Sequence, residues 1–563
     1  MLDWQSSFSR TRRKTRNYGN GWVIAVSAIA LLMVSPILVV LSSVFTNSSD
    51  IWNHLATTVL PQYIQHSLAL MVGVGIGVLL IGITTAWLVT MCRFPGSRYF
   101  EWALLLPLAA PAYLLAYTYT DVLDYFGPVQ TGLRTVFDWQ RATDYWFPNI
   151  RSVWGAVLLF SLTLYPYVYM LTRVAFLEQS TATLEASRSL GCGPWRSFWT
   201  VALPLARPAI AAGTALALME TLNDFGTVEY FSVPTFTTGI YRTWFGMGDR
   251  VAAVQLAAVL LMFIFALILL ERWSRRQARY YQTQGCKARQ SSYKLSGWRA
   301  GLAFLACLLP VTLGLLVPLG LLLSMTVRNL DETLDSSFWQ LGSHSLILAG
   351  LTALLAMGLS LVMAYGVRLN NTSPLRLGVR LASLGYAVPG AVIAVGILVP
   401  LAQFDNALDD WMQASFGIST GLLLSGTIVA LVFAYLVRFL AVAFGTVESG
   451  LAKIRPTLDD ASRSLGYGPM NTLAKVHAPL MGSSLLTALM LVFVDVMKEL
   501  PATMVIRPFN FDTLAVRVYQ YAADERLVEA SGPALAIILA GLVPVIFLSW
   551  QITATQTSGS EKA

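Results

Sequence analysis

The sequence predicts an all-α, polytopic membrane protein with about twelve transmembrane helices in two repeated halves. Three observations support this prediction. Apolar residues make up 56% of the 563 residues and charged residues only 12%, whereas about 25% of the residues of a soluble protein are charged. Long apolar segments recur along the whole chain, and one six-residue motif occurs twice. Lipid is therefore the expected solvent for most of the chain.

Twelve segments are long and apolar enough to cross a bilayer as helices, which takes roughly 20 residues each. The first of them is too long for the apolar core of a signal peptide, and other spans follow it, so we expect it to remain as a helix. The predicted spans are 21–45, 66–91, 99–120, 153–172, 208–227, 251–270, 302–326, 345–367, 381–402, 421–438, 481–503 and 531–550.

Basic residues set the expected orientation of these spans. Five Lys or Arg residues precede the first span and eight lie in the central linker, whereas 46–64 and 403–420 contain none. Because Lys and Arg stay on the cytoplasmic side, both termini and the linker are expected in the cytoplasm. The predicted organisation is a basic N-terminal segment (1–20), a first six-helix domain (21–271), a basic linker (272–300), a second six-helix domain (301–550) and a cytoplasmic tail (551–563).

The sequence lacks the motifs of several other functions. It has no GxxxxGK[ST] phosphate-binding loop, so any ATP hydrolysis is expected on a separate subunit. Its four cysteines form no CxxC pair, its four histidines show no ligand spacing, and no nucleophile–base set is present. We therefore expect a chain that is not an enzyme and that binds no cofactor itself. The net charge of +8 is spread between apolar segments, which disfavours nucleic acid as a partner.

A long internal repeat divides the chain into two related halves. The residues ASRSLG occupy 186–191 and again 461–466, an offset of 275 positions. The same offset pairs Pro204 with Pro479. With six helices in each half, the two halves have the same orientation in the membrane. The sequence therefore predicts a parallel repeat with a pathway between the halves.

Each copy of the motif lies between the fourth and fifth span of its half, on the expected cytoplasmic side. In the first copy, Thr181 or Thr183 can cap a short helix that ends at Gly191, and Pro194 suits the first turn of a second helix. These residues resemble the EAA loop of binding-protein-dependent ABC importer permeases. The matching residues are Glu185-Ala186-Ser187, Gly191 and Val201-Ala202-Leu203-Pro204, and in the second copy Asp460-Ala461-Ser462, Gly466 and Val476-His477-Ala478-Pro479.

The resemblance implies a type I ABC importer permease, with the MetI-like fold, in the bacterial inner membrane. It implies two cytoplasmic ABC ATPase subunits, which bind ATP and Mg2+, and a periplasmic binding protein that delivers the cargo. In that family the short helix docks on the ATPase. The residues that the resemblance places in the two docking elements are Glu185, Ala186, Gly191, Asp460, Ala461 and Gly466. The second copy departs from the family pattern at Asp460 and Ala478, and the alternative is a capped loop that meets no partner.

The fifth span of each half contains two carboxylates. Glu220 and Asp224 are four residues apart, hence on one face of a helix, and the repeat gives Asp495 and Glu499 the same spacing. A charge at the bilayer centre costs about 2.5–3.5 kcal/mol on insertion scales, so these side chains are expected to face the pathway, water or a cation. Two facing pairs form an acidic constriction that attracts cations. Carboxylate oxygens suit hard cations, including ferric ion.

A structural role for the acids is the alternative. Lys498 lies three residues from Asp495 and can neutralise it in a buried ion pair. Such a pair locks helices together without contacting the substrate. The two interpretations stay open at this point.

Further residues around the acids narrow the resemblance. The segments 219–228, 495–503 and 507–515 resemble the fused permeases of periplasmic ferric-iron importers, and the likeness covers essentially the whole chain. It implies Fe3+ as the cargo and a periplasmic iron-binding protein as its donor. Thiamine permeases share the fused layout, and related permeases carry polyamines, so these cations are alternatives. A secondary transporter that uses the carboxylates for ion coupling is a further alternative, which needs no docking motif.

Overall fold

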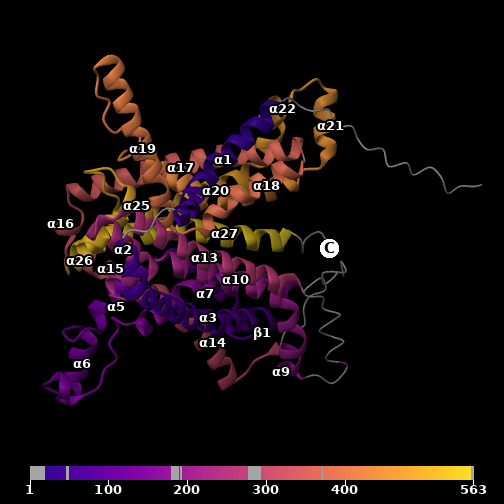
Figure 1. Ribbon diagram of the computed structural model, residues 1–563. Helices are drawn as coiled ribbons and strands as arrows, with labels where there is room; N and C mark the ends of the chain where they lie inside the picture. Colours follow the sequence, from indigo (N-terminus) through magenta and orange to yellow (C-terminus); the bar gives the residue numbers. More distant parts are fainter. Residues whose placement is uncertain are drawn as a thin grey trace, which may run out of the picture.

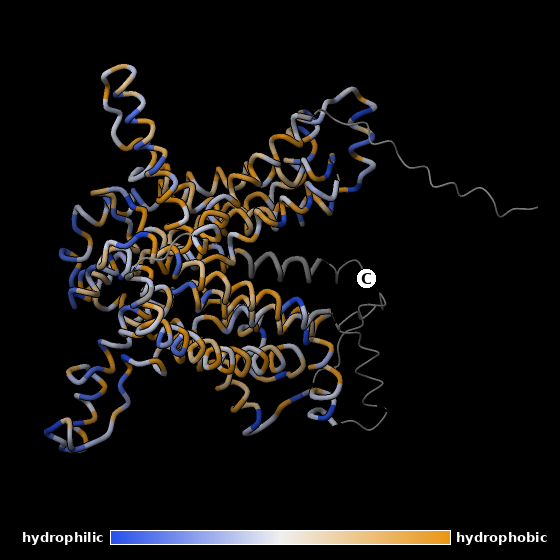
Figure 2. Tube along the Cα trace, in the orientation of Figure 1, coloured by the Kyte–Doolittle hydropathy of each residue, from blue (hydrophilic) through white to orange (hydrophobic). Residues whose placement is uncertain are grey.

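The computed structural model describes residues 20–45, 50–178, 189, 193–276, 293–370 and 372–558. In these ranges the protein is almost entirely helical, with one two-stranded ladder. Among the described residues, ten helices are long and apolar enough to cross a membrane, and two bent helix pairs raise the number to as many as twelve. Figure 2 shows apolar residues along the middle of the helix bundle and hydrophilic residues gathered at its two ends. The predicted all-α fold with about twelve spans is confirmed.

The first half contains six spans and several short connecting elements. The α-helices are α1 (Asn20–Ser42), α2 (Asp50–Thr58), α3 (Leu60–Met91), α4 (Ser97–Ala103), α5 (Ala112–Leu123), α6 (Pro128–Phe137), α7 (Val153–Glu178), α9 (Pro194–Ser197), α10 (Leu203–Asn223), α11 (Gly226–Tyr230), α12 (Phe236–Tyr241) and α13 (Arg250–Arg276). The 3-10 and π turns are η1 (Ser43–Phe45), η2 (Leu106–Ala109), η3 (Ala142–Asp144), η4 (Phe198–Ala202) and η5 (Arg242–Gly246), and the strand is β1 (Cys92–Arg93).

The second half repeats this order after strand β2 (Tyr293–Lys294). Its α-helices are α14 (Trp298–Val311), α15 (Val317–Arg328), α16 (Leu330–Thr333), α17 (Ser336–Leu369), α18 (Ser373–Ala382), α19 (Gly390–Phe416), α20 (Ile428–Ala452), α21 (Pro456–Ser464), α22 (Pro469–Thr472), α23 (Ala478–Leu480), α24 (Gly482–Met497), α25 (Pro501–Ile506), α26 (Leu514–Ala523) and α27 (Leu527–Ser558). Its 3-10 and π turns are η6 (Thr312–Leu316), η7 (Ser383–Ala387) and η8 (Leu473–His477).

The third span of each half is interrupted at a proline. α5 begins after Pro111 and α19 after Pro389, and the residues before these prolines, Ala110 and Val388, have extended backbone. Proline has no N–H to donate and disfavours helical backbone in the residue before it. The two parts of the first interrupted span lie at 89° to each other. Both interruptions bring a helix start to the interface between the halves.

The first and last spans of each half pack against the third span of the other half. α1 and α13 contact α19, while α15 and α27 contact α5. Glycines allow close approach here: a Cβ on Gly396 would lie 2.6 Å from the carbonyl oxygen of Pro36, and one on Gly541 would lie 2.7 Å from that of Ala109. The two sequence halves are therefore interleaved in space.

A short ladder ties the linker to the first half. Strand β1 pairs in parallel with β2, and the N–H of Leu295 donates to the carbonyl of Arg93. This ladder sets α14 beside α3 and α4 of the first half. The first span of the second half therefore packs against the first half from its first turns.

The repeated motifs mark one end of the molecule. The helix α9 follows the first copy of the motif, and α21 contains part of the second copy. Figure 1 shows these two helices at two corners of the same end. The hairpin that contains α6 and the last turns of α19 project at the other end. We call these the motif end and the opposite end.

Replacing Gly541 by alanine is expected to destabilise the interleaved packing by about 1–3 kcal/mol, because the new methyl group meets the backbone of Ala109 and not a movable side chain. Thermal unfolding of the purified protein in detergent measures the effect. Gly320→Ala is the matched control, because nothing lies within 4 Å of a Cβ at that position. Equal unfolding temperatures for the two variants would contradict the close contact.

Candidate functional site

The four predicted acids line one cavity between the two halves. The cavity has a volume of about 110 Å3. Glu220 and Asp224 reach it from the end of α10, and Asp495 and Glu499 reach it from the end of α24. Side chains that the sequence places 275 positions apart therefore meet at one place in the fold.

Arg438 also lines this cavity and locates it at mid-depth. It lies ten residues from the start of α20, or about 15 Å along the helix, which is half of a hydrocarbon core roughly 30 Å thick. The predicted tenth span ended at residue 438, and that boundary is wrong because α20 continues to Ala452. The arginine therefore lies within the span, where a charge signals a functional position.

Asp224 and Glu499 each cap a short helix. Asp224 accepts two backbone N–H groups, at 2.9 and 3.3 Å, at the start of α11. Glu499 accepts two more, at 2.9 and 3.1 Å, at the start of α25. Carboxylates stabilise helix N-termini because they satisfy free N–H groups and face the positive end of the helix dipole. These two acids therefore also stabilise the starts of helices, a structural role that their spacing in the sequence does not predict.

Two cationic side chains pair with the acids. Arg438 Nη1 lies 3.0 Å from Glu499 Oε1 and its Nη2 lies 3.9 Å from Glu220 Oε2, so the arginine links the two halves. Lys498 Nζ lies 2.9 Å from Asp495 Oδ1, which is the ion pair that the structural alternative predicted. The cavity thus contains four carboxylates and two cationic groups, and its formal charge is negative.

The two halves touch directly at the cavity wall. Asn223 Oδ1 accepts a hydrogen bond of 2.8 Å from the N–H of Gly390, the first residue of α19. A Cβ on Gly390 would lie 2.6 Å from Glu499 Oε1 and 2.8 Å from Arg438 Nη1. Only glycine fits at this approach, which explains the Pro-Gly sequence at the interruption of the third span of the second half.

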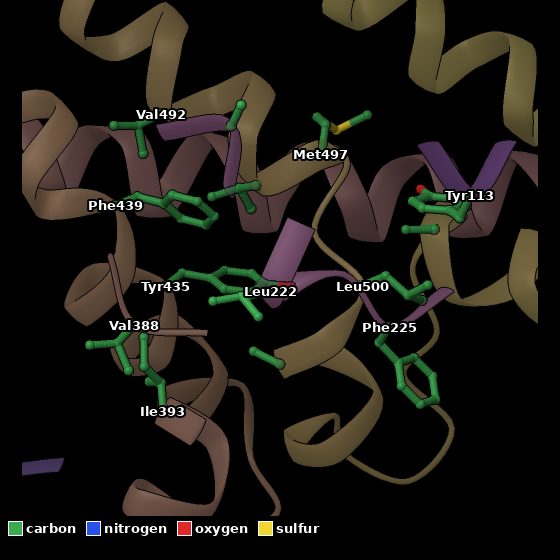
Figure 3. Close-up of a cluster of buried hydrophobic side chains, with 14 of the residues drawn as sticks. Tyr113, Leu222, Phe225, Val388, Ile393, Tyr435, Phe439, Val492, Met497 and Leu500 are labelled. Atoms are coloured by element: carbon green, nitrogen blue, oxygen red, sulfur yellow. The ribbon is translucent and has the colours of Figure 1, made fainter. Parts of the chain in front are cut away.

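Apolar side chains next to the acids also line the cavity. Phe225 and Leu500 directly follow the two capping acids and are 2% and 1% exposed. Figure 3 shows them near Tyr113 and Leu222. The ring of Phe225 also packs on Tyr519 of the second half, with ring centroids 5.6 Å apart. Residues from both halves thus form this apolar part of the cavity wall.

The acids do not form a ready-made metal site. In the part of the chain that the structure describes, no three His, Cys, Asp or Glu side chains lie close enough together to hold one ion. Tyr113, Tyr167 and Tyr386 complete the polar wall. The cavity offers a cation an acidic, oxygen-lined passage and not a chelating cage.

The second copy of the repeated motif forms a helix with two different faces. α21 carries Asp460 and Ala461 and ends before Gly466, whose φ of 83° is the left-handed conformation that glycine allows. Leu458, Ala461 and Leu465 follow one face at i, i+3 and i+7, and the two leucines are 41% and 76% exposed. A short helix thus ends just before the motif glycine in this copy, the arrangement that the sequence predicts for the first copy, and its apolar stripe suits a partner protein.

The first copy is described only in part. Glu185, Ala186 and Gly191 lie outside the described residues. The helix α9 begins at Pro194, as predicted, and its second residue, Trp195, is 75% exposed. The roles of the three motif residues stay predictions.

Comparison with known proteins agrees with this architecture. Residues 6–279 match the family described as the binding-protein-dependent transport system inner membrane component. The molybdenum transport system permease protein ModB of Escherichia coli is 30% identical over 205 residues, which are 86% of that protein and 35% of this chain. The chain belongs to this family. ModB corresponds to a single half of the fused permease, which fits the internal repeat.

Relatives of this permease that extend over most of its length also exist. The Fe(3+)-transport system permease protein FbpB 2 of Haemophilus influenzae is 25% identical over 492 residues, which are 86% of this chain and 89% of that protein. The ferric transport system permease protein FbpB of Actinobacillus pleuropneumoniae is 22% identical over 481 residues, which are 81% of this chain and 66% of that protein. Both halves of this chain are therefore matched by these two relatives.

Proposed function

We propose that this permease carries ferric iron from a periplasmic iron-binding protein into the cytoplasm, driven by ATP hydrolysis on partner subunits. The observation that carries the proposal is the cavity between the halves, where carboxylates from equivalent positions outnumber cationic side chains. An excess of carboxylates at a constriction attracts cations and repels anions. The relatives that extend over most of the chain are named as iron permeases, which supports Fe3+ as the cation.

The motif end faces the cytoplasm in this proposal, and each motif receives one of two ABC ATPase subunits. The exposed apolar stripe of α21 supports a protein partner there. ATP and Mg2+ bind to those subunits, and the permease itself holds no cofactor. Both termini lie on the cytoplasmic side, and the iron-binding protein docks at the opposite end.

In the proposed cycle, the ATPase subunits close on ATP and draw the two motifs together. This movement parts Phe225 from Leu500, and the iron-binding protein releases its ion into the cavity. The carboxylates offset the cost of moving a trivalent cation through a low-dielectric region. Because the acids form no chelating set, the ion is held weakly enough to leave when hydrolysis resets the permease.

Other cargoes fit the cavity less well. The molybdenum and sulfate permeases among the relatives match about a third of the chain, and an acidic cavity repels their anions. Thiamine and polyamines are cations and are the alternatives. An ion-coupled secondary transporter has no ATPase subunits to bind, so it does not account for the two repeated motifs.

Reconstitution in proteoliposomes with the ATPase and the iron-binding protein tests the proposal. We expect uptake of radiolabelled Fe3+ that requires both ATP and the binding protein. A complex that hydrolyses ATP and imports thiamine or a polyamine, but no iron, would overturn the cargo. Uptake driven by an ion gradient in the absence of the ATPase would overturn the ATP-driven mechanism.

A further inference from the structure

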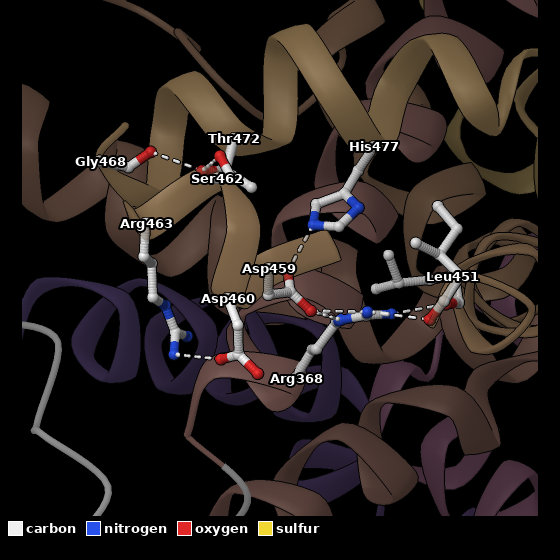
Figure 4. A network of polar contacts seen from close by, with 10 residues as sticks. Arg368, Leu451, Asp459, Asp460, Ser462, Arg463, Gly468, Thr472 and His477 are labelled. Atoms are coloured by element: carbon white, nitrogen blue, oxygen red, sulfur yellow. Dashed lines mark hydrogen bonds and ion pairs between the residues drawn. The ribbon is translucent and has the colours of Figure 1, made fainter. Parts of the chain in front are cut away.

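Asp459, on the inward face of α21, is the centre of a polar network (Figure 4). Arg368 Nη2 and Nε lie 2.7 and 3.0 Å from Asp459 Oδ2, and His477 Nε2 lies 2.7 Å from Asp459 Oδ1. Because a carboxylate only accepts, both partners donate to it. The network joins α21 to the last turn of α17 and to η8.

The network is largely shielded from water. The side chain of His477 is 0% exposed, that of Asp459 is 13% exposed and that of Arg368 is 18% exposed. Arg368 also donates to the carbonyls of Leu451 (2.6 Å) and Ile454 (2.9 Å), at the end of α20. A guanidinium whose donors are engaged in several directions fixes its partners in one geometry. Arg368 thus holds the ends of α17 and α20 against α21.

His477 connects this network with the cavity. It ends η8, which continues through α23 into α24, and α24 carries Asp495 and precedes Glu499. The segment Pro469–Leu480 lies at 81° to α24. Asp459 and His477 therefore connect α21 with the base of the helix that positions the acids.

The first half differs from this network in sequence. The offset of 275 places Leu184, Ala202 and Arg93 at the positions of Asp459, His477 and Arg368. The arginine recurs, but the acid and the histidine do not, and Ala202 is fully buried. The full set of three side chains is therefore particular to the second half.

We propose that Arg368 is a positioning residue for motor coupling. It holds Asp459 against His477, so that displacement of the second motif by the ATPase moves α24 and the cavity. This inference rests on the proposed ATP-driven function.

The test removes the network from the second half, with Arg368→Thr, Asp459→Leu and His477→Ala in one variant. Replacing a buried ion pair by apolar residues is often neutral for stability, so the complex is expected to assemble. We expect ATP hydrolysis stimulated by the binding protein to stay close to wild type, while Fe3+ imported per ATP falls about fivefold or more. Arg380→Gln, at an exposed arginine of α18, is the control and is expected to change neither quantity.

A second readout does not depend on the cargo. Spin labels at Leu80 of α3 and Leu486 of α24, both exposed, report the distance between the halves. We expect an ATP-dependent change of this distance in the otherwise wild-type complex and a much smaller one in the triple variant. Equal changes, together with equal import per ATP, would overturn the inference and make the network merely structural.

Two further outcomes separate this inference from the proposed function. If the otherwise wild-type complex shows no ATP-dependent change of distance, the ATP-driven function fails and the inference fails with it. If the triple variant does not assemble, Arg368→Lys keeps the charge but loses the forked donors. Normal import per ATP in that variant would overturn the role of Arg368, and reduced import would support it.

Discussion

Replacing Glu220 by glutamine and Asp495 by asparagine together is expected to lower Fe3+ uptake about tenfold or more and to leave the fold intact. A tenfold loss of uptake rate requires an increase of only about 1.4 kcal/mol in the free-energy barrier to transport. Two unit charges 4 Å apart interact by about 4 kcal/mol at an effective dielectric constant near 20. The double change leaves equal numbers of carboxylates and cationic groups in the cavity, so a trivalent ion loses its net attraction to the site.

The fold is expected to survive because neither of these acids caps a helix, and because Lys498, which loses Asp495 as its partner, is 29% exposed and faces the cavity. Asp224 and Glu499 hold α11 and α25 and are left in place. Initial rates of uptake in proteoliposomes, with ATP hydrolysis measured in parallel, give the result. Glu332→Gln with Glu448→Gln is the matched control, because these exposed acids lie away from the cavity. Unchanged uptake in the cavity variant would leave iron as the cargo and make Glu220 and Asp495 structural.

Much of the fold could be predicted because the bilayer imposes a length of about 20 apolar residues on every span. The repeat then fixed the relation between the halves. The interleaving of α1 and α15 with the opposite halves could not be predicted, because apolarity does not say which neighbour a helix packs on. The bend at Pro111 is signalled by the proline, but its angle depends on tertiary packing.

The sequence predicts only part of the candidate site, again because contacts between the halves decide the rest. The spacing of four residues within each pair, together with the repeat, predicted that Glu220, Asp224, Asp495 and Glu499 lie together, as they do. The ion pair between Lys498 and Asp495 was predicted as the structural alternative. The capping roles were missed because the predicted fifth and eleventh spans ran to residues 227 and 503, whereas α10 ends at Asn223 and α24 at Met497. Where a helix ends depends on contacts across the two halves, and no local pattern records those contacts.

Replacing Arg438 by leucine is expected to destabilise the permease by about 3–5 kcal/mol, because it leaves the carboxylate of Glu499 buried without its cationic partner. The side chains of Arg438 and Glu499 are 7% and 1% exposed, so water cannot replace the lost interaction. Thermal unfolding in detergent measures the loss. Arg380→Gln on the surface helix α18 is expected to change stability little and serves as the control.

Adding Glu499→Gln to the Arg438→Leu variant is expected to restore part of the stability, since no unpaired charge is then left at this position. The double variant is expected to cost about 1–3 kcal/mol less than the sum of the two single variants. It loses one charge of each sign, so carboxylates still outnumber cationic groups and uptake is expected to recover with stability. Strictly additive losses would show that the two side chains are not coupled. Recovered stability without recovered uptake would show that the bridge from Arg438 to Glu220 and Glu499, and not only the charge of the cavity, is needed for passage of the cation.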